Sequence, residues 1–251
     1  MRSSWSRWAA YAGTVAALYL LWKIAAVQTG SAVLPHPEEV FAAFGQALFT
    51  AAFWGHFSSS GFRAVSAMAI AWAIGFPLGI LMGGSKRIDA VLSPAVFLTY
   101  PIPKIVLLPV VLLLFGLGDL SKVVMISLIL GYQVLVTTRD GVRTIPGQYL
   151  DSVRSLGASK PQIVTEVLVP GALPHGFTAL RLNSGVSVAV LFFVESFATQ
   201  QGLGYLIMDA WGRLDYQEMF VGIFGMSLLG VLLYEAANRL ERISCRWRFC
   251  S

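Results

Sequence analysis

The chain has 251 residues, of which 56% are hydrophobic and only 12% charged, and its mean hydropathy is +0.70. A soluble domain carries about 25% charged residues, so this composition excludes a soluble protein. The net charge of +5 reflects basic residues placed between apolar runs, and it does not indicate a nucleic acid partner. Segments of about ten residues with alternating hydrophobicity, which a membrane barrel needs, do not recur. We therefore expect an all-α integral membrane protein with a single domain over residues 1–251.

Six apolar segments are long enough to cross a hydrocarbon core about 30 Å thick. In chain order they cover about residues 9–27, 65–84, 91–116, 123–138, 178–199 and 220–237. The first run could be a secretory signal, but it continues through LYLLWK without a small-residue cleavage site, which favours an uncleaved helix. Between the first two spans, PHPEE predicts the start of a helix along the membrane surface. In the second span, Gly75, Gly79 and Gly83 permit close contact with another helix, within the subunit or at a dimer interface.

Basic residues predict the orientation of the spans, because Lys and Arg concentrate on the cytoplasmic side. With the N-terminus inside, four basic residues lie in outer segments, Lys104 lies within a span and thirteen lie in inner segments. The inner set is Arg2, Arg7, Lys86, Arg87, Arg139, Arg143, Arg154, Lys160, Arg181, Arg239, Arg242, Arg246 and Arg248, and the outer set is Lys23, Arg63, Lys122 and Arg213. Both termini are therefore expected in the cytoplasm, where Cys245 and Cys250 should be free thiols.

The longest inner loop, residues 139–177, contains the polar stretch DSVRSLGASKPQIVTEVLVPGALP at 151–174. A helix is predicted to start near Pro146 and to end at Gly157, a residue type that takes a left-handed cap without steric cost. A second helix is predicted after Ser159, and Pro170 and Pro174 are predicted to break the chain before the fifth span. Isolated helices this short are marginal in water, so the rest of the protein or a partner must hold them.

This stretch resembles the EAA loop of the permease subunits of ABC importers. Gly157 stands at the glycine of that motif, and Asp151, Ser152 and Val153 stand where Glu, Ala and Ala are usual. Ile163 and the Leu-Pro pair at 173–174 complete the match. LTYPIPKIVLLPVVLLLFGLGDLSK, GVRTIPGQYLDSVRSLGAS and QGLGYLIMDAW are similar to the subgroup that imports nitrate, sulfonates and taurine, in the same order along about 200 residues.

The resemblance implies a type I ABC importer permease fold, in which two copies of this chain pair with two cytoplasmic ATP-binding subunits and an extracytoplasmic solute-binding protein. ATP and Mg²⁺ would be bound by the ATP-binding subunit, and this chain would hold no cofactor. The loop would act as a coupling helix that docks into the ATP-binding subunit, with Asp151, Ser152, Val153, Arg154, Ser155, Leu156, Gly157, Ala158 and Ser159 at the contact. Asp151 keeps the usual negative charge on a shorter side chain, and Val153 is bulkier than Ala, so the fit can differ from that of the family.

The chain itself is not expected to be an enzyme. It has no G-x-x-x-x-G-K-[ST] loop for phosphates, and GGSK at 83–86 is too short. His36, His56 and His175 fall in no ligand spacing for a metal.

Ionisable residues within spans are costly in lipid and therefore candidates for function. Lys104 follows YPIP, whose prolines free backbone groups that must face protein or water, so Lys104 and Tyr100 could line a path for an anionic solute. Lys104 could equally reach the inner interface or pair internally. Glu195 could line or gate the path, although a structural hydrogen bond to a neighbouring helix is favoured, and in either role we expect it to be paired.

The favoured interpretation is the permease subunit of an ATP-driven importer for a small, anionic solute such as a sulfonate, taurine or nitrate. It would lie in the inner membrane and work by alternating access at a homodimer interface. A pyrimidine vitamin precursor or another small organic solute stays open. The alternative class is a stand-alone secondary carrier, which needs no coupling helix and usually contains two repeated halves, and no such repeat is evident in this chain.

Overall fold

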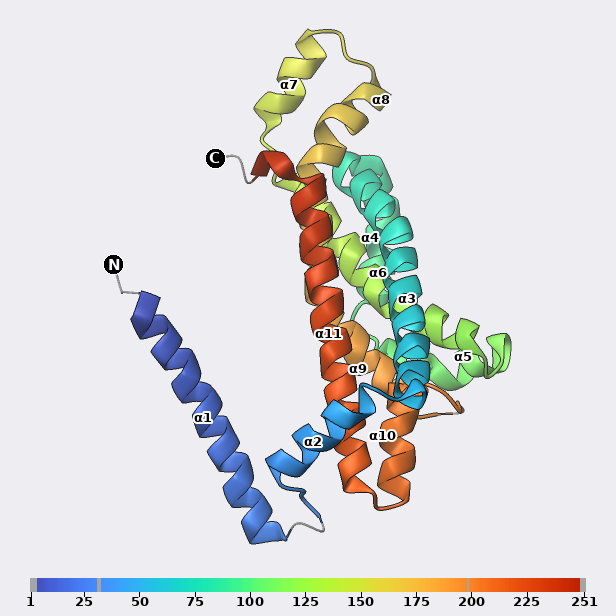
Figure 1. Cartoon of the computed structure of the whole chain (residues 1–251). Coiled ribbons are helices and arrows are strands. Elements are labelled where there is room, and N and C mark those ends of the chain that lie inside the picture. The colour runs from blue at the N-terminus through green and yellow to red at the C-terminus, as the bar shows by residue number, and fades with distance from the viewer. Residues whose placement is uncertain (1–3, 31–32, 198, 249–251) are drawn as a thin grey trace.

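The computed structural model describes residues 4–30, 33–197 and 199–248 and, within the first helix, the side chains from Ala12 onward. The described part of the chain contains helices and their connections and no strand, which confirms the expected all-α fold (Figure 1). Cys250 lies outside the described residues. The helices are α1 (Ser4–Thr29), α2 (Pro37–Ala47), α3 (Ala51–Gly84), α4 (Lys86–Thr99), α5 (Leu108–Phe115), α6 (Asp119–Arg143), α7 (Gly147–Ser155), α8 (Lys160–Ile163), α9 (Val169–Glu195), α10 (Leu203–Gly212) and α11 (Tyr216–Ser244). Three short helical turns are also present: η1 (Lys104–Leu107) before α5, η2 (Val164–Leu168) between α8 and α9, and η3 (Arg246–Arg248) after α11.

Five described segments are long and apolar enough to cross a membrane, and a bent pair of helices makes a sixth. The single segments are Ala12–Thr29, Ala51–Gly84, Asp119–Arg143, Lys160–Glu195 and Tyr216–Ser244. Several helices extend beyond the spans expected from hydropathy, because their terminal turns carry polar residues. Arg63, expected in an outer segment, therefore lies inside α3.

The third expected span, 91–116, is wrong as a single helix. It consists of α4 and the η1–α5 segment, which meet at an angle of 80°. The break falls at YPIP, where Pro101 and Pro103 lack the N–H groups that would continue the backbone ladder. α5 then ends at Gly116, whose φ is 77°. The two prolines that cause the break are visible in the sequence, but the segment is apolar throughout, and hydropathy alone therefore predicted one continuous span.

The break predicted at Pro170 and Pro174 is also wrong, because α8, η2 and α9 form one candidate span from Lys160 to Glu195. η2 is a π-helical turn, in which the Val169 N–H reaches back five residues to the Val164 carbonyl. In a regular α-helix the Pro170 ring would clash with the carbonyl four residues before it, and the wider turn provides room for the ring. The expected inner loop 139–177 is thus reduced to a connection at 144–159 around α7.

The close packing expected for the small residues of the second span occurs within the subunit. α3 and α6 make the most extensive helix contact in the described structure. A Cβ on Gly79 would lie 2.7 Å from both the Leu135 carbonyl oxygen and the Thr138 Cβ, so the two backbones touch through this glycine.

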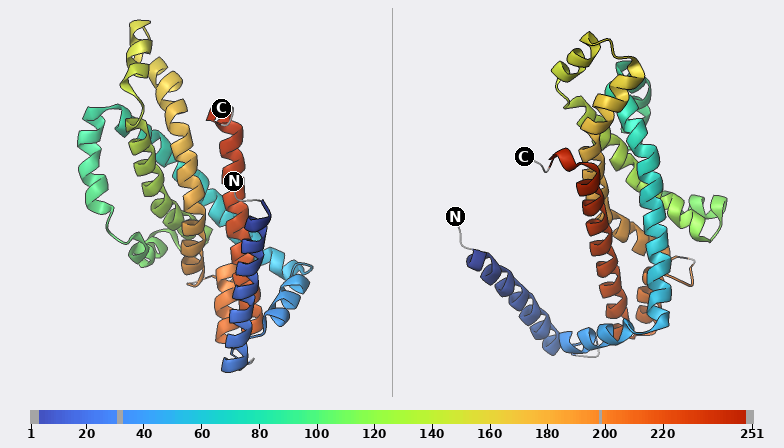
Figure 2. Two further views of the ribbon diagram at one scale, coloured as in Figure 1. Left: turned by 90° about the vertical axis from the view of Figure 1, so that its left-hand side faces the viewer. Right: turned by 45° about the horizontal axis from the view of Figure 1, so that its top comes forward.

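The helices form a bundle with two distinct ends (Figures 1 and 2). α7 and α8 project beyond the long helices at one end, and α2 and α10 lie at the other. We call these the α7 end and the α2 end. α2 begins at Pro37, which confirms the helix expected from PHPEE. α1 is tied to α2 by an ion pair between Lys23 and Glu38. Trp22 of α1 also stacks on Phe220 and Phe224 of α11, with ring centres 5.4 and 6.1 Å apart, and the N-terminal part of α1 stands away from the bundle (Figure 1).

Candidate functional site

α7 is the most prominent feature outside the bundle, and its cap has a defined geometry. Gly157 has a φ of 80°, which confirms the left-handed conformation expected from the sequence. The Gly157 N–H donates to the Arg154 carbonyl at 2.9 Å, and the Ala158 N–H donates to the Val153 carbonyl at 3.1 Å. This pair of bonds is the Schellman motif, which satisfies carbonyl groups that the helix end would otherwise leave free.

The helix expected after Ser159 is present as α8, with Ser159 as its N-cap. The Ser159 backbone N–H donates to Gln162 Oε1 at 2.8 Å, and Pro161 lies in the first turn of α8. Together the two caps fix the direction of the chain on both sides of Gly157, so the connection between α7 and α8 is a rigid corner.

α7 carries large apolar side chains that the bundle covers only in part. Leu150 and Val153 are half-buried, whereas Leu156 is 86% exposed and Tyr149 is 57% exposed. Large apolar side chains exposed together on a segment beyond the bundle are typical of interaction surfaces. A groove of about 530 Å³ separates α7 from η2, with Tyr149, Val153 and Leu156 on one side.

The polar side chains of α7 are engaged within the helix. Asp151 pairs with Arg154 at 3.3 Å, and both side chains are mostly exposed. The Ser152 hydroxyl donates to the Gln148 carbonyl, and the Ser155 hydroxyl donates to the Ser152 carbonyl. An exposed ion pair of this kind contributes about 0–1 kcal/mol, so it holds Asp151 and Arg154 together only weakly.

A second candidate site surrounds the break between α4 and α5. A cavity of about 340 Å³ is lined by Tyr100 and Lys104 together with Tyr132 and Gln133 of α6 and Val190 of α9. The structure thus brings two of the three candidate path residues together. Tyr132, which sequence reasoning did not identify, forms the opposite wall, and its hydroxyl lies 2.9 Å from the Thr99 hydroxyl.

Lys104 has its charge satisfied by the protein in this conformation. Its Nζ donates to the carbonyl oxygens of Thr99 and Tyr100, both at 3.0 Å, and of Ile102 at 3.3 Å. The same Nζ lies 4.1 Å from the centre of the Tyr132 ring, a cation–π distance. The ammonium group therefore stabilises the carbonyls that the broken helix leaves free, and it borders the cavity at the same time.

Glu195, the third candidate, lies apart from this cavity at the α2 end. It is 1% exposed, and its carboxylate accepts from Arg63 Nη1 at 2.6 Å, from the Ser60 hydroxyl and from the Gly204 N–H at 2.9 Å. The expectation that Glu195 is paired is confirmed. Arg63 is itself 4% exposed and also donates through Nε to Asp119 at 2.7 Å.

This network joins four helices. Arg63 and Ser60 belong to α3, Glu195 ends α9, Asp119 begins α6, and Gly204 lies in the first turn of α10. Two N–H groups at the start of α10 are satisfied here, one by Glu195 and one by the Ser60 hydroxyl, which accepts from the Leu203 N–H at 2.7 Å. Sequence reasoning missed Arg63 because hydropathy placed it just outside a span.

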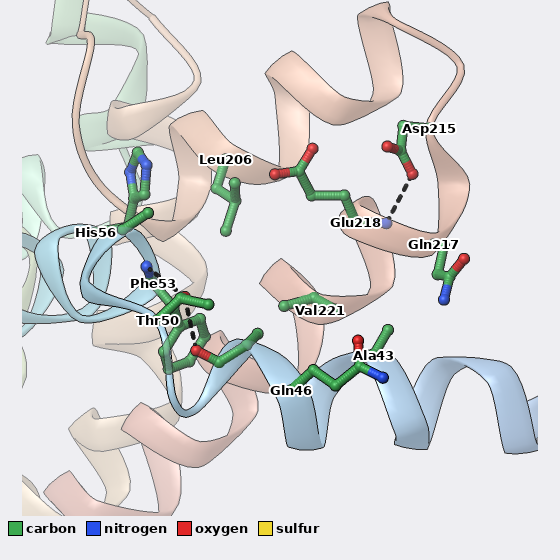
Figure 3. A pocket seen from close by; sticks show the side chains of 12 residues that line it. Ala43, Gln46, Thr50, Phe53, His56, Leu206, Asp215, Gln217, Glu218 and Val221 are labelled. Carbon is green, nitrogen blue, oxygen red and sulfur yellow. Dashed lines mark hydrogen bonds between the residues drawn. The ribbon is translucent and has the colours of Figure 1, made fainter.

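The α2 end also contains the cavity drawn in Figure 3, of about 440 Å³ between α2, α3, α10 and α11. Phe53, Leu206 and Val221 give it apolar walls, and Gln46, Thr50, His56 and Glu218 add polar groups to the lining (Figure 3). No pattern in the sequence singled out this cavity, because its lining residues come from four helices.

The comparisons with known proteins agree with one another. Residues 75–244 match the family described as the binding-protein-dependent transport system inner membrane component. The taurine transport system permease protein TauC of Escherichia coli is 32% identical over 242 residues, which cover 94% of this chain and 88% of that protein. A putative aliphatic sulfonates transport permease of Bacillus subtilis is 29% identical and covers 86% of this chain and 78% of its own length. A formylaminopyrimidine transport permease of Halalkalibacterium halodurans is also 29% identical, over 92% of both chains.

Among solved structures, the inward-facing MetNI methionine ABC transporter shares the fold. Its similar chain aligns with a TM-score of 0.64 at 19% identity, over 75% of this chain and 94% of that one. The shared fold agrees with the expected type I importer permease architecture, in which the helices described above form the membrane part. The matched residues run from Gly75, within α3, to the end of α11 and include α7, the broken span and Glu195, whereas Ser60 and Arg63 precede them. The chain belongs to the family of binding-protein-dependent transport system inner membrane components, and it is a multi-pass membrane permease.

Proposed function

We propose that this chain is the permease subunit of an ATP-driven importer and that α7 couples it to a cytoplasmic ATP-binding subunit. The observation that carries the proposal is the capped, outward-projecting α7 with Leu156 and Tyr149 exposed at its surface. Family membership supports a binding protein as a further partner, since the family is named for its dependence on one. The α7 end is then cytoplasmic, and both termini lie on the inner side of the membrane.

The importer would contain two copies of this chain, two ATP-binding subunits and one solute-binding protein. The binding protein would dock at the α2 end, where the cavity of Figure 3 opens. The solute would cross by alternating access at the interface between the two copies, along a path that the cavity beside Tyr100 and Lys104 helps to form. The broken span favours this path, because irregular backbone at membrane depth is tolerated where it is buried in protein or lines water.

The proposed solute is a small anion of the sulfonate or taurine class. The relatives named for taurine and for aliphatic sulfonates support this choice. The relative named for formylaminopyrimidine supports a second candidate, an uncharged pyrimidine precursor. A cation at the cavity favours the anion, although the ammonium group of Lys104 would have to exchange at least one carbonyl partner to bind it.

The test is reconstitution of the chain in proteoliposomes with its ATP-binding subunit and its binding protein. We expect uptake of labelled taurine or an alkanesulfonate that requires ATP inside and the binding protein outside. Uptake that proceeds without the ATP-binding subunit, driven by an ion gradient, would refute the proposal and favour a secondary carrier. Uptake of a formylaminopyrimidine in place of both sulfonates would keep the importer and reject the anionic solute.

A further inference from the structure

The end of α11 and the turn η3 that follows it carry a pattern of exposed side chains that the transport mechanism does not use. Three arginines, Arg239, Arg242 and Arg246, are exposed, and each is followed directly by an exposed apolar residue. These followers are Leu240 at 52%, Ile243 at 63% and Trp247 at 54% exposure. Among the described residues, none of the three guanidinium groups has an ion-pair partner.

Buried side chains hold the end of α11 against the bundle. Glu241 is 1% exposed and accepts from Arg181 of α9 at 2.9 Å and from Arg248 at 2.8 Å. Cys245, between α11 and η3, is fully buried. The last turn is therefore anchored to the bundle, and the directions of Arg246 and Trp247 are fixed with it. Glu235, one turn before Arg239, contacts the Asn238 amide at 3.5 Å and lies deeper along α11.

An apolar groove begins beside this basic end. It has a volume of about 360 Å³ and runs between α3 and α11 over α9, with Val65, Trp72, Phe177, Leu233, Ala236 and Leu240 in its walls. Leu240 belongs both to the groove and to the exposed apolar residues that alternate with the arginines. The groove thus leads from the basic end toward the middle of the span.

We propose that this surface, Arg239, Arg242, Arg246 and Trp247 with the adjoining groove, binds an anionic phospholipid of the cytoplasmic leaflet. This inference rests on the proposed orientation, which places the α7 end inside. The arginines would hold the phosphate and its charged headgroup, and the groove would hold an acyl chain. Tryptophan favours the level of the headgroups because its ring is amphipathic, and Trp247 lies beside the basic residues.

A lipid fits this surface better than the ATP-binding subunit does. The surface alternates basic with exposed apolar side chains, and it continues into a groove on a membrane-crossing helix. A protein that docks on α7 meets the molecule further out, because α7 projects beyond the end of α11 (Figures 1 and 2).

The experiment titrates the full chain in mild detergent with phosphatidylglycerol or phosphatidylcholine and counts bound lipid by native mass spectrometry. The test variant is Arg239→Gln, Arg242→Gln and Arg246→Gln together. The matched control is Lys86→Gln, Arg87→Gln and Lys160→Gln, which removes three exposed positive charges at the same end of the molecule. A cation near an anionic lipid contributes about fivefold in affinity, so the test variant, which lacks three of them, should lose about 100-fold for phosphatidylglycerol. The control variant should lose much less, and phosphatidylcholine binding should be equal in both.

A further variant, Ala236→Trp, fills the groove without changing charge. It should lower the binding of both lipids to the same extent, since only the acyl chain is displaced. Equal loss of phosphatidylglycerol in the test and control variants would overturn the proposal. So would unchanged lipid binding with loss of the ATP-binding subunit from the test variant, which would assign the arginines to that protein. Selective lipid binding by a chain that never co-purifies with an ATP-binding subunit would refute the importer and leave the lipid site in place.

Discussion

Substitution of Gly157 tests the coupling role of α7 most directly. Its φ of 80° is a conformation in which a Cβ costs about 1–2 kcal/mol, and a β-branched side chain costs more. An added Cβ would meet no atom within 4 Å, so the cost is confined to the backbone and no packing clash obscures it. None of the residues that cross the membrane changes, and insertion of the spans should be normal in Gly157→Ala and Gly157→Val.

The strain should appear as weaker docking. We assume that only chains with the capped corner fit the ATP-binding subunit. The apparent affinity is then the intrinsic affinity multiplied by the fraction of chains that keep this corner. A cost of about 1–2 kcal/mol corresponds to a loss of about 5- to 30-fold for alanine, and valine should lose more. Gly157→Asn should lose least, because asparagine tolerates the left-handed conformation better than other side chains do.

The assay is paired: affinity for the ATP-binding subunit by pull-down, and solute-stimulated ATP turnover in proteoliposomes. Gly147, at the start of α7, provides the control, because it too has open space around its Cβ position and its φ is not positive. Gly147→Ala should match the wild type. Wild-type values for Gly157→Val in both measurements would show that α7 is not the coupling element, and the importer proposal would lose its main support.

Three further predictions concern the remaining sites. Lys104→Met should lower uptake of an anionic solute while the ATP-binding subunit still co-purifies, and the three freed carbonyls should reduce the free energy of unfolding by about 1–3 kcal/mol. Unchanged uptake with reduced stability would make Lys104 purely structural. Glu195→Gln should destabilise the chain by about 3 kcal/mol in thermal unfolding, because it leaves the buried Arg63 with Asp119 as its remaining carboxylate. The double variant Glu195→Gln with Arg63→Met should be less destabilised than the sum of the single variants, and simple additivity would contradict the pairing. A membrane-impermeant maleimide should label Cys245 and Cys250 only after cells are permeabilised, and labelling of intact cells would reverse the orientation. Burial raises the pKa of the Cys245 thiol, so in the Cys250→Ser variant labelling should be slow and should rise with pH as the thiolate forms.

The local conformation of the connection at 144–159 was predictable because short-range chemistry decides it. Glycine after a polar helix, and serine followed by proline and glutamine, fix the two caps within a few residues, and both caps occur as expected. The surface helix after PHPEE follows the same rule. Prolines were less informative, since Pro101 and Pro103 break a span whereas Pro170 and Pro174 lie in a continuous one. The difference depends on whether the backbone can widen locally, as it does in η2, and residue identity alone does not specify that.

The sequence by itself determined that this chain crosses a membrane as helices, since 56% hydrophobic residues in long runs allow no soluble fold. It also determined the corner at Gly157, because only local backbone sterics are involved. Tertiary structure alone decided which distant groups meet. Glu195 finds Arg63 132 residues away, and Tyr132 closes the cavity of Lys104 from another helix. A buried charge must have a partner, so the sequence implies that Glu195 is paired. The identity of that partner depends on how the helices pack, which no local pattern contains.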